Sequence, residues 1–178
     1  MRCYKLEIAG LLRDLPICAI NEGLSIAAFI MTGDVELTIA CAAELLQKSP
    51  EFDIILTAEA KSIPLCYEMA RQSGKPYVVA RKSKKLYMSE VIAAEVCSIT
   101  TALPQTLFID KVGADRLCGK RVLIVDDVIS TGESLKALEK LVALAGGAVA
   151  AKMAVLAEGD AALREDIVFL EKLPLFAN

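Results

Sequence analysis

Two adjacent acids in the segment 121–134, which reads RVLIVDDVISTGES, have the types and spacing of a ligand site. Asp126 and Asp127 follow an apolar run that predicts a short buried strand over 122–125, and a turn of small residues then opens a helix at Ser134. A helix start binds anions through its free N–H groups and its positive dipole end. Two carboxylates beside it suit hydroxyls or a divalent cation. Because adjacent acids repel each other without such partners, the pattern predicts a site for a phosphorylated sugar.

This segment resembles the phosphoribosyl-pyrophosphate (PRPP) loop of type I phosphoribosyltransferases. In that family a hydrophobic strand, two acids and two apolar residues precede a small-residue phosphate turn, and every position over 123–134 fits the pattern. The resemblance implies that Asp126 and Asp127 hold the ribose hydroxyls and a Mg²⁺ ion, the latter through ligand or water oxygens. It also implies that the 5′-phosphate is bound by Ile129, Ser130, Thr131, Gly132, Glu133 and Ser134.

A second polar loop follows the strand expected over 52–56. Adenine-type members of the family often have Glu-Ala-Arg-Gly there, and the loop binds pyrophosphate through backbone N–H groups and one basic residue. A lysine in place of the arginine supplies charge without a bidentate contact. The resemblance therefore assigns to pyrophosphate the loop formed by Glu59, Ala60, Lys61 and Ser62.

A basic run over 81–85 follows the strand expected over 77–80 and ends at Leu86. It is similar to the Arg-Lys-x-x-Lys-Leu segment of adenine phosphoribosyltransferases. Its positive charges are suited to binding a negatively charged pyrophosphate. By this likeness pyrophosphate is contacted, within one subunit or across a dimer interface, by Arg81, Lys82 and Lys85.

The alternation of strand-like and helix-like segments predicts an α/β fold, a mainly parallel twisted sheet flanked by helices, with functional loops at the carboxyl ends of its strands. Strands are expected over 52–56, 77–80, 122–125 and 148–156, with strand-like pieces at 91–99 and 106–109. Helices are expected over 25–49, capped by Ser25 and with a break near Gly33, and over 64–73, 134–144 and 160–172.

The family resemblance also implies a hood that closes over the reacting centre and excludes water. The segment 87–109 corresponds to this mobile element. Residues 1–24, with part of the C-terminal tail, are expected to form a small hood over the base. The whole chain, 1–178, is interpreted as a single phosphoribosyltransferase domain.

Composition narrows the function classes. The 178 residues contain no histidine, which excludes serine–histidine and cysteine–histidine catalysis and histidine-based metal sites. A net charge of −3 gives no excess of positive charge for binding nucleic acid. No apolar run approaches the roughly 18 residues of a membrane span. Six scattered cysteines without a CxxC pair indicate a reduced, cytoplasmic protein. The hydrophobic content of 55% is high, and some of that excess is expected to cover a subunit interface; together with the family resemblance, the expected assembly is a homodimer.

The combined interpretation is a purine-type phosphoribosyltransferase that moves 5-phosphoribose from PRPP to a nucleobase and releases pyrophosphate. Adenine is favoured by the likeness over 81–86, while xanthine, guanine or hypoxanthine, and orotate remain open. No catalytic residue is assigned, because no acid lies between Val96 and Ile109. That absence, and the likeness of 157–159 to the ligand-sensing domain of a purine repressor, motivate an alternative, a non-catalytic PRPP sensor. A dinucleotide-binding oxidoreductase is disfavoured, because no GxGxxG follows the first strand.

Overall fold

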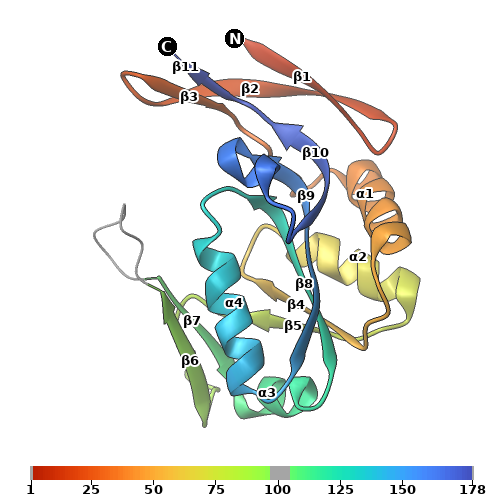
Figure 1. Ribbon diagram of the computed structural model, residues 1–178, viewed down its shortest axis with the longest axis vertical. Helices are drawn as coiled ribbons and strands as arrows, with labels where there is room; N and C mark the ends of the chain where they lie inside the picture. Colours follow the sequence, from red (N-terminus) through yellow and green to blue (C-terminus); the bar gives the residue numbers. More distant parts are fainter. Residues whose placement is uncertain (1, 97–104, 178) are drawn as a thin grey trace.

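The computed structural model describes residues 2–96 and 105–177, and a parallel sheet forms its centre (Figure 1). The strand order in this sheet is β10-β9-β8-β4-β5, and each neighbouring pair runs parallel. Strands buried on both faces are near-continuous apolar runs, which is the pattern of the central strands here. The strands are β4 (Ile54–Ala58), β5 (Tyr77–Ala80), β8 (Arg121–Ile129), β9 (Ala148–Glu158) and β10 (Val168–Leu173). The predicted parallel α/β fold is confirmed.

Helices cover both faces of this sheet. Successive side chains of β8 alternate between two cores, because neighbouring residues of a strand point to opposite faces. Leu123 and Val125 join the core beneath α1 (Val35–Lys48) and α2 (Ile63–Ser73). Their neighbours Val122 and Ile124 join the core beneath α3 (Lys111–Leu117) and α4 (Glu133–Leu144). Within the described residues, none of the helices has the length and apolarity needed to span a bilayer.

A small antiparallel sheet lies beyond the carboxyl ends of the parallel strands (Figure 1). Its strand order is β1-β2-β3-β11, so it combines residues from both ends of the described chain. The chain passes from β10 through Pro174 directly into this sheet. The strands are β1 (Cys3–Ile8), β2 (Leu11–Asn21), β3 (Leu24–Ala27) and β11 (Leu175–Ala177). Residues 1–24 and the tail are therefore neighbours, on the side of the parallel sheet where functional loops lie.

The single helix predicted over 25–49 is wrong before Val35. Ser25 is not a helix cap; it lies in β3 and pairs with Phe176 of β11. The helix α1 begins only after Asp34, whose carboxylate accepts a hydrogen bond from the N–H of Leu37 at 3.0 Å. The apolar residues of β3 pair with the preceding strand β2 and with the remote strand β11, which local periodicity does not reveal.

The helix predicted over 160–172 is also wrong. Residues Gly159–Leu163 form a short 3₁₀ helix, η1, and Val168–Leu173 then adds strand β10 to the edge of the sheet. The strand predicted over 122–125 is too short, because β9 continues to pair with β8 as far as Ile129. The predicted helix over 64–73 is confirmed and ends at Gly74, whose φ of 69° is left-handed.

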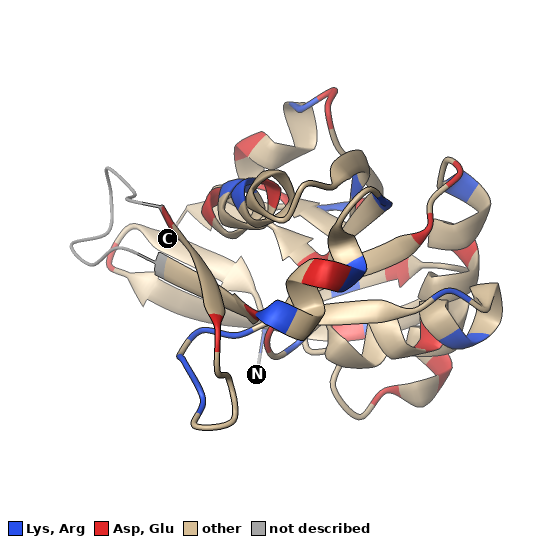
Figure 2. Cartoon of the chain, turned by 90° about the horizontal axis from the view of Figure 1, so that it is seen from below, with Lys and Arg blue, Asp and Glu red and all other residues tan. Residues whose placement is uncertain are grey.

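An antiparallel hairpin of β6 (Val91–Val96) and β7 (Gln105–Asp110) packs against α4. Residues 97–104, which include part of the strand piece expected at 91–99 and much of the expected mobile hood, lie outside the described residues. The loop that joins β5 to β6 carries several Lys and Arg positions (Figure 2).

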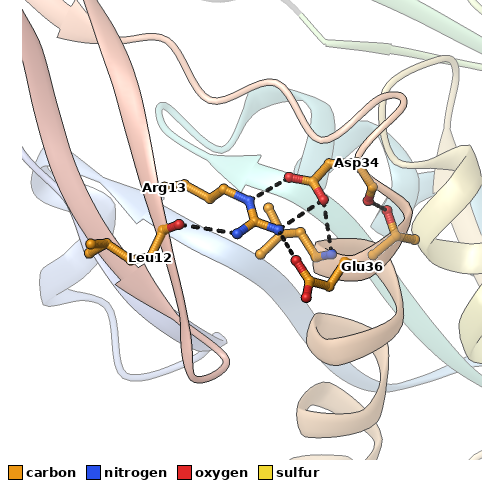
Figure 3. Close-up of polar contacts among 6 residues, drawn as sticks. Leu12, Arg13, Asp34 and Glu36 are labelled. Atoms are coloured by element: carbon orange, nitrogen blue, oxygen red, sulfur yellow. Dashed lines mark hydrogen bonds and ion pairs between the residues drawn. The ribbon is translucent and has the colours of Figure 1, made fainter.

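An arginine of the small sheet joins it to the first turn of α1 (Figure 3). The Nε of Arg13 donates to Asp34 Oδ2 at 2.6 Å, and its Nη2 donates to Glu36 Oε2 at 2.8 Å. Asp34 is also the N-cap of α1, so one carboxylate serves two elements. The hydrogen bond from Arg13 lowers the pKa of Asp34. The orientation of the small sheet therefore depends in part on a helix cap.

We expect Asp34→Ala to reduce the free energy of unfolding by about 1–2 kcal/mol, since it removes both a cap and an ion pair. Because the pKa of Asp34 is lowered in the folded protein, its contribution is present above the ordinary aspartate pKa and is lost as pH falls. Urea denaturation at neutral pH measures this change. The control Glu36→Ala removes the more exposed partner and should cost at most about 0.5 kcal/mol. Equal losses in the two variants would contradict the assignment.

Candidate functional site

The two adjacent acids lie at the carboxyl end of β8, in the middle of the parallel sheet. Asp127 is buried, with 6% of its surface exposed, and its Oδ2 has no hydrogen-bond partner among the described residues. Leaving a buried carboxylate oxygen unpaired is costly, and such groups are rare in folded proteins. The Asp127 carboxylate therefore points to a ligand that donates hydrogen bonds or carries positive charge.

Asp126 is held by contacts from two directions. Its Oδ1 accepts a hydrogen bond from Ser62 Oγ at 2.9 Å and another from the N–H of Asp127 at 3.0 Å. Desolvation, and secondarily the charge of Asp127, raise the pKa of Asp126. Because burial and the charge of Asp127 both disfavour the ionised form of Asp126, a cation or hydroxyl donors would stabilise its charge.

The loop after β4 is fixed to the same acids. Thr57 Oγ1 donates to Ser62 Oγ at 2.9 Å, and Ser62 in turn reaches Asp126. Ser62 is the N-cap residue of α2 but makes no side-chain cap bond, since its hydroxyl faces β8. Thr57 was not among the predicted site residues. Its signal in the sequence is a polar side chain inside an otherwise apolar strand.

A cavity of about 180 Å³ opens between this loop and β8. It gathers side chains from three strand ends, including both acids, the loop after β4 and one lysine of the basic run. The peptide bond between Glu59 and Ala60 in its wall is cis. The lining residues are Ala58, Glu59, Ala60, Lys61, Ser62, Lys82, Asp126, Asp127, Val128 and Ser134.

A second cavity, of about 110 Å³, is formed by the turn between β8 and α4. Gly132 is the N-cap of α4 at a φ of 78°, and no side chain caps the helix there. The start of α4 is therefore suited to binding an anion. The cavity shares Asp126, Val128 and Ser134 with the first one. The remaining lining residues are Ile129, Ser130, Thr131, Gly132, Glu133 and Leu135.

Of the predicted pyrophosphate contacts, Glu59 lines the first cavity, whereas Arg81 and Lys85 do not. The Glu59 carboxylate accepts from the N–H of Lys82 at 2.6 Å and forms an ion pair with Arg81 Nε at 3.1 Å. Glu59 thus contacts the basic loop through its side chain. Lys85 Nζ donates to Ser83 Oγ at 2.7 Å. Arg81 and Lys85 line neither of the two cavities, whereas Lys82 lines the first.

The three parts of the site offer different chemistry. The turn before α4 suits a phosphate group, and the acids of β8 suit hydroxyls or a cation. Lys61 and Lys82 line the same cavity as the acids and supply positive charge there. The arrangement can therefore hold a polyol that carries an anionic group at each end. It contains no histidine or cysteine nucleophile.

Comparison with known proteins agrees with this geometry. The family model described as "Phosphoribosyl transferase domain" matches residues 36–172. An adenine phosphoribosyltransferase from Rhodococcus jostii is 34% identical over 125 residues, which cover 68% of this chain and 63% of that protein. A hypoxanthine/guanine phosphoribosyltransferase from Methanocella paludicola is 30% identical over 124 residues, covering 68% and 59%. The chain thus matches somewhat less than two-thirds of the length of these relatives.

A solved structure extends the likeness to the whole fold. The crystal structure of adenine phosphoribosyltransferase from Thermoanaerobacter pseudethanolicus superposes with a TM-score of 0.72 at 26% identity, covering 89% of this chain and 95% of that one. The family model spans most of the chain, and the acids of β8 and the turn before α4 lie inside its range. The chain therefore belongs to the type I phosphoribosyltransferase family.

Proposed function

We propose that this protein is a purine phosphoribosyltransferase, which transfers 5-phosphoribose from PRPP to a ring nitrogen of the base and releases pyrophosphate. The observation that carries the proposal is the unpaired, buried Oδ2 of Asp127, beside Asp126, in a cavity that continues into the anion-binding turn. PRPP has a phosphate, ribose hydroxyls and a pyrophosphate in that spatial order. Each of these groups has a complementary part in the site.

In this proposal, different residues bind different parts of PRPP. The acids of β8 hold the ribose hydroxyls, and the N–H groups of 129–134 hold the 5′-phosphate. As the bond from ribose to pyrophosphate breaks, the sugar gains positive charge and the leaving group gains negative charge. Lys61 and Lys82, which line the cavity with the acids, would offset the charge of the leaving group, while Asp126 and Asp127 would bind the sugar. Arg81 and Lys85 would reach pyrophosphate only after the loop 81–87 moves or from another subunit.

Mg²⁺ fits the donor groups present. This ion keeps several waters and is bound through one or two carboxylates together with substrate phosphates. Asp126 and Asp127 provide carboxylate oxygens at the cavity, directly or through water, and PRPP would provide the rest. When bound, the ion would neutralise phosphate charge and orient the substrate.

The small sheet is the proposed hood over the base. It lies beyond the carboxyl ends of β8, β9 and β10, where ligands bind in open α/β sheets (Figure 1). A cover there would exclude water, which otherwise competes with the base for the reactive sugar. Adenine is the proposed base, supported by the likeness over 81–86 and by the adenine-specific names of several relatives. Other relatives are named for hypoxanthine and guanine, so the base needs a direct test.

Pyrophosphate release from PRPP and Mg²⁺ should be measured with adenine, hypoxanthine, guanine, xanthine and orotate, each offered separately. We expect release with adenine above all, because the basic run matches adenine-type members. Release with hypoxanthine or guanine alone would keep the enzyme class and correct the base. Calorimetric binding of PRPP without release for any base would instead support the PRPP sensor, in agreement with the missing acid between Val96 and Ile109.

The roles assigned to the two acids and to Lys82 can be tested separately in binding experiments. Asp126→Asn with Asp127→Asn should weaken PRPP binding by at least about 100-fold, because two charged hydrogen-bond acceptors are lost. Lys82→Ala should weaken pyrophosphate binding far more than nucleoside 5′-monophosphate binding, measured by calorimetry. Circular dichroism checks that each variant is folded. Unchanged PRPP affinity in the double variant, or equal losses for both ligands in Lys82→Ala, would refute the assigned roles.

We also infer that the protein is a homodimer. Exposed apolar side chains of α1 and α2, among them Val35, Ile39 and Tyr67, line a cavity of about 420 Å³. A monomer seldom leaves so many apolar side chains together in water. Sedimentation velocity should therefore give about twice the chain mass of 19.1 kDa. Sedimentation as a single 19.1 kDa species at micromolar concentration would contradict this inference.

A further inference from the structure

One arginine outside the predicted site lies directly against the turn before α4. If a Cβ atom were placed on Gly132, it would lie 2.5 Å from Nη1 of Arg164. No side chain other than that of Arg164 is among the three nearest neighbours of that position within 4 Å. Arg164 follows η1 and precedes β10, about thirty residues along the chain from the turn that it touches. Neither the spacing of acids nor the small-residue pattern of the turn indicates this contact.

The orientation of this guanidinium is fixed by an aspartate. Arg164 Nε donates to Asp166 Oδ1 at 2.9 Å, and Nη2 donates to Asp166 Oδ2 at 2.7 Å. This bidentate pairing uses one edge of the guanidinium and directs Nη1 toward Gly132. Asp166 is held in turn by Lys152 of β9, which also donates to Glu139 of α4 at 2.9 Å. The group is thus part of an ion-pair network between α4, β9 and the start of β10.

The position of this contact has consequences for anion binding. Gly132 is the N-cap of α4, and its left-handed φ of 78° shapes a turn in which no side chain caps the helix. A guanidinium packed on that residue restricts its movement. It also adds positive charge at a helix start, where positive potential favours an anion. A Cβ at position 132 would displace the guanidinium, and the left-handed φ of this residue itself favours glycine.

We propose that Arg164 is a positioning residue for the phosphate turn: oriented by Asp166, its guanidinium holds Gly132 in place and strengthens binding of a phosphate monoester at the start of α4. The inference rests on the proposed function, because it supposes that the turn over 129–134 receives the 5′-phosphate. It assigns Arg164 no contact with the reacting atoms.

Calorimetry with ribose 5-phosphate and with pyrophosphate, each titrated separately, tests the proposal. Arg164→Gln should bind ribose 5-phosphate about fivefold to tenfold more weakly, the effect of one charge at a helix terminus, and should bind pyrophosphate as the wild type does. Arg164→Lys keeps the charge without the bidentate fork, so its affinity should lie between the two. The deficit of Arg164→Gln should shrink as salt is added, which loss of packing alone would not produce.

Arg121→Gln is the matched control. Arg121 is held by Asp53 in the same bidentate manner, with Nη2 to Oδ1 at 2.8 Å and Nε to Oδ2 at 3.1 Å, but at the opposite end of β8. Its variant should bind both ligands with wild-type affinity. Thermal unfolding of all variants confirms that they are folded, and Arg164→Lys serves as the second variant if Arg164→Gln is not.

The two proposals fail in different ways. Wild-type protein that does not bind ribose 5-phosphate would overturn the proposed function together with this inference. If the wild-type protein binds ribose 5-phosphate and either Arg164→Gln or Arg164→Lys binds it with wild-type affinity, this inference alone would be overturned. Equal weakening of ribose 5-phosphate and pyrophosphate by Arg164→Gln would also overturn it, because the effect would then be general rather than local to the turn.

Discussion

The structure is organised around two adjacent carboxylates at the carboxyl end of its central strand. Asp126 and Asp127 are partly or fully buried, lie next to each other in β8 and share a neighbourhood that disfavours a second negative charge. An arrangement of this kind costs folding free energy unless a partner is supplied. The protein meets that cost locally with the hydroxyl of Ser62 and with one backbone N–H group, and leaves Asp127 Oδ2 unpaired. The neighbouring loops are best understood as parts that complete this pair with a ligand.

The parallel sheet explains why those loops can meet. Residues 58–62, 82 and 126–134 are far apart in sequence, yet their strands β4, β5 and β8 are adjacent and end at one edge. Each strand is followed by a different polar segment, so the edge combines functions that no single segment holds. The apolar faces of β8 fix its position from both sides, which makes the location of the acids a result of core packing.

The local sequence pattern was sufficient to predict the secondary structure of segments whose apolar spacing matches the element that they form. The helix ending at Gly74, strand β5 and the turn before α4 follow from the apolar spacing and from glycine positions. It failed for β3 and β10, which are strands because of their pairing with β2 and β11 and with β9 rather than because of their own periodicity. The same limit applies to the site. The acids and Lys82 could be proposed from motif likeness, whereas Thr57 is only weakly marked and Arg164 is visible only once η1 is placed beside Gly132.

The hydroxyl chain from Thr57 through Ser62 to Asp126 joins two strand ends through contacts within the protein. Ordering a loop during association typically costs about 0.5–1.5 kcal/mol for each immobilised side chain. Here the Ser62 side chain already sits in a defined place, so that part of the entropy is lost during folding rather than on binding. A ligand entering between the loop and β8 would therefore meet a side chain that is already hydrogen-bonded in place, and its binding would depend more on charge and shape than on ordering that side chain.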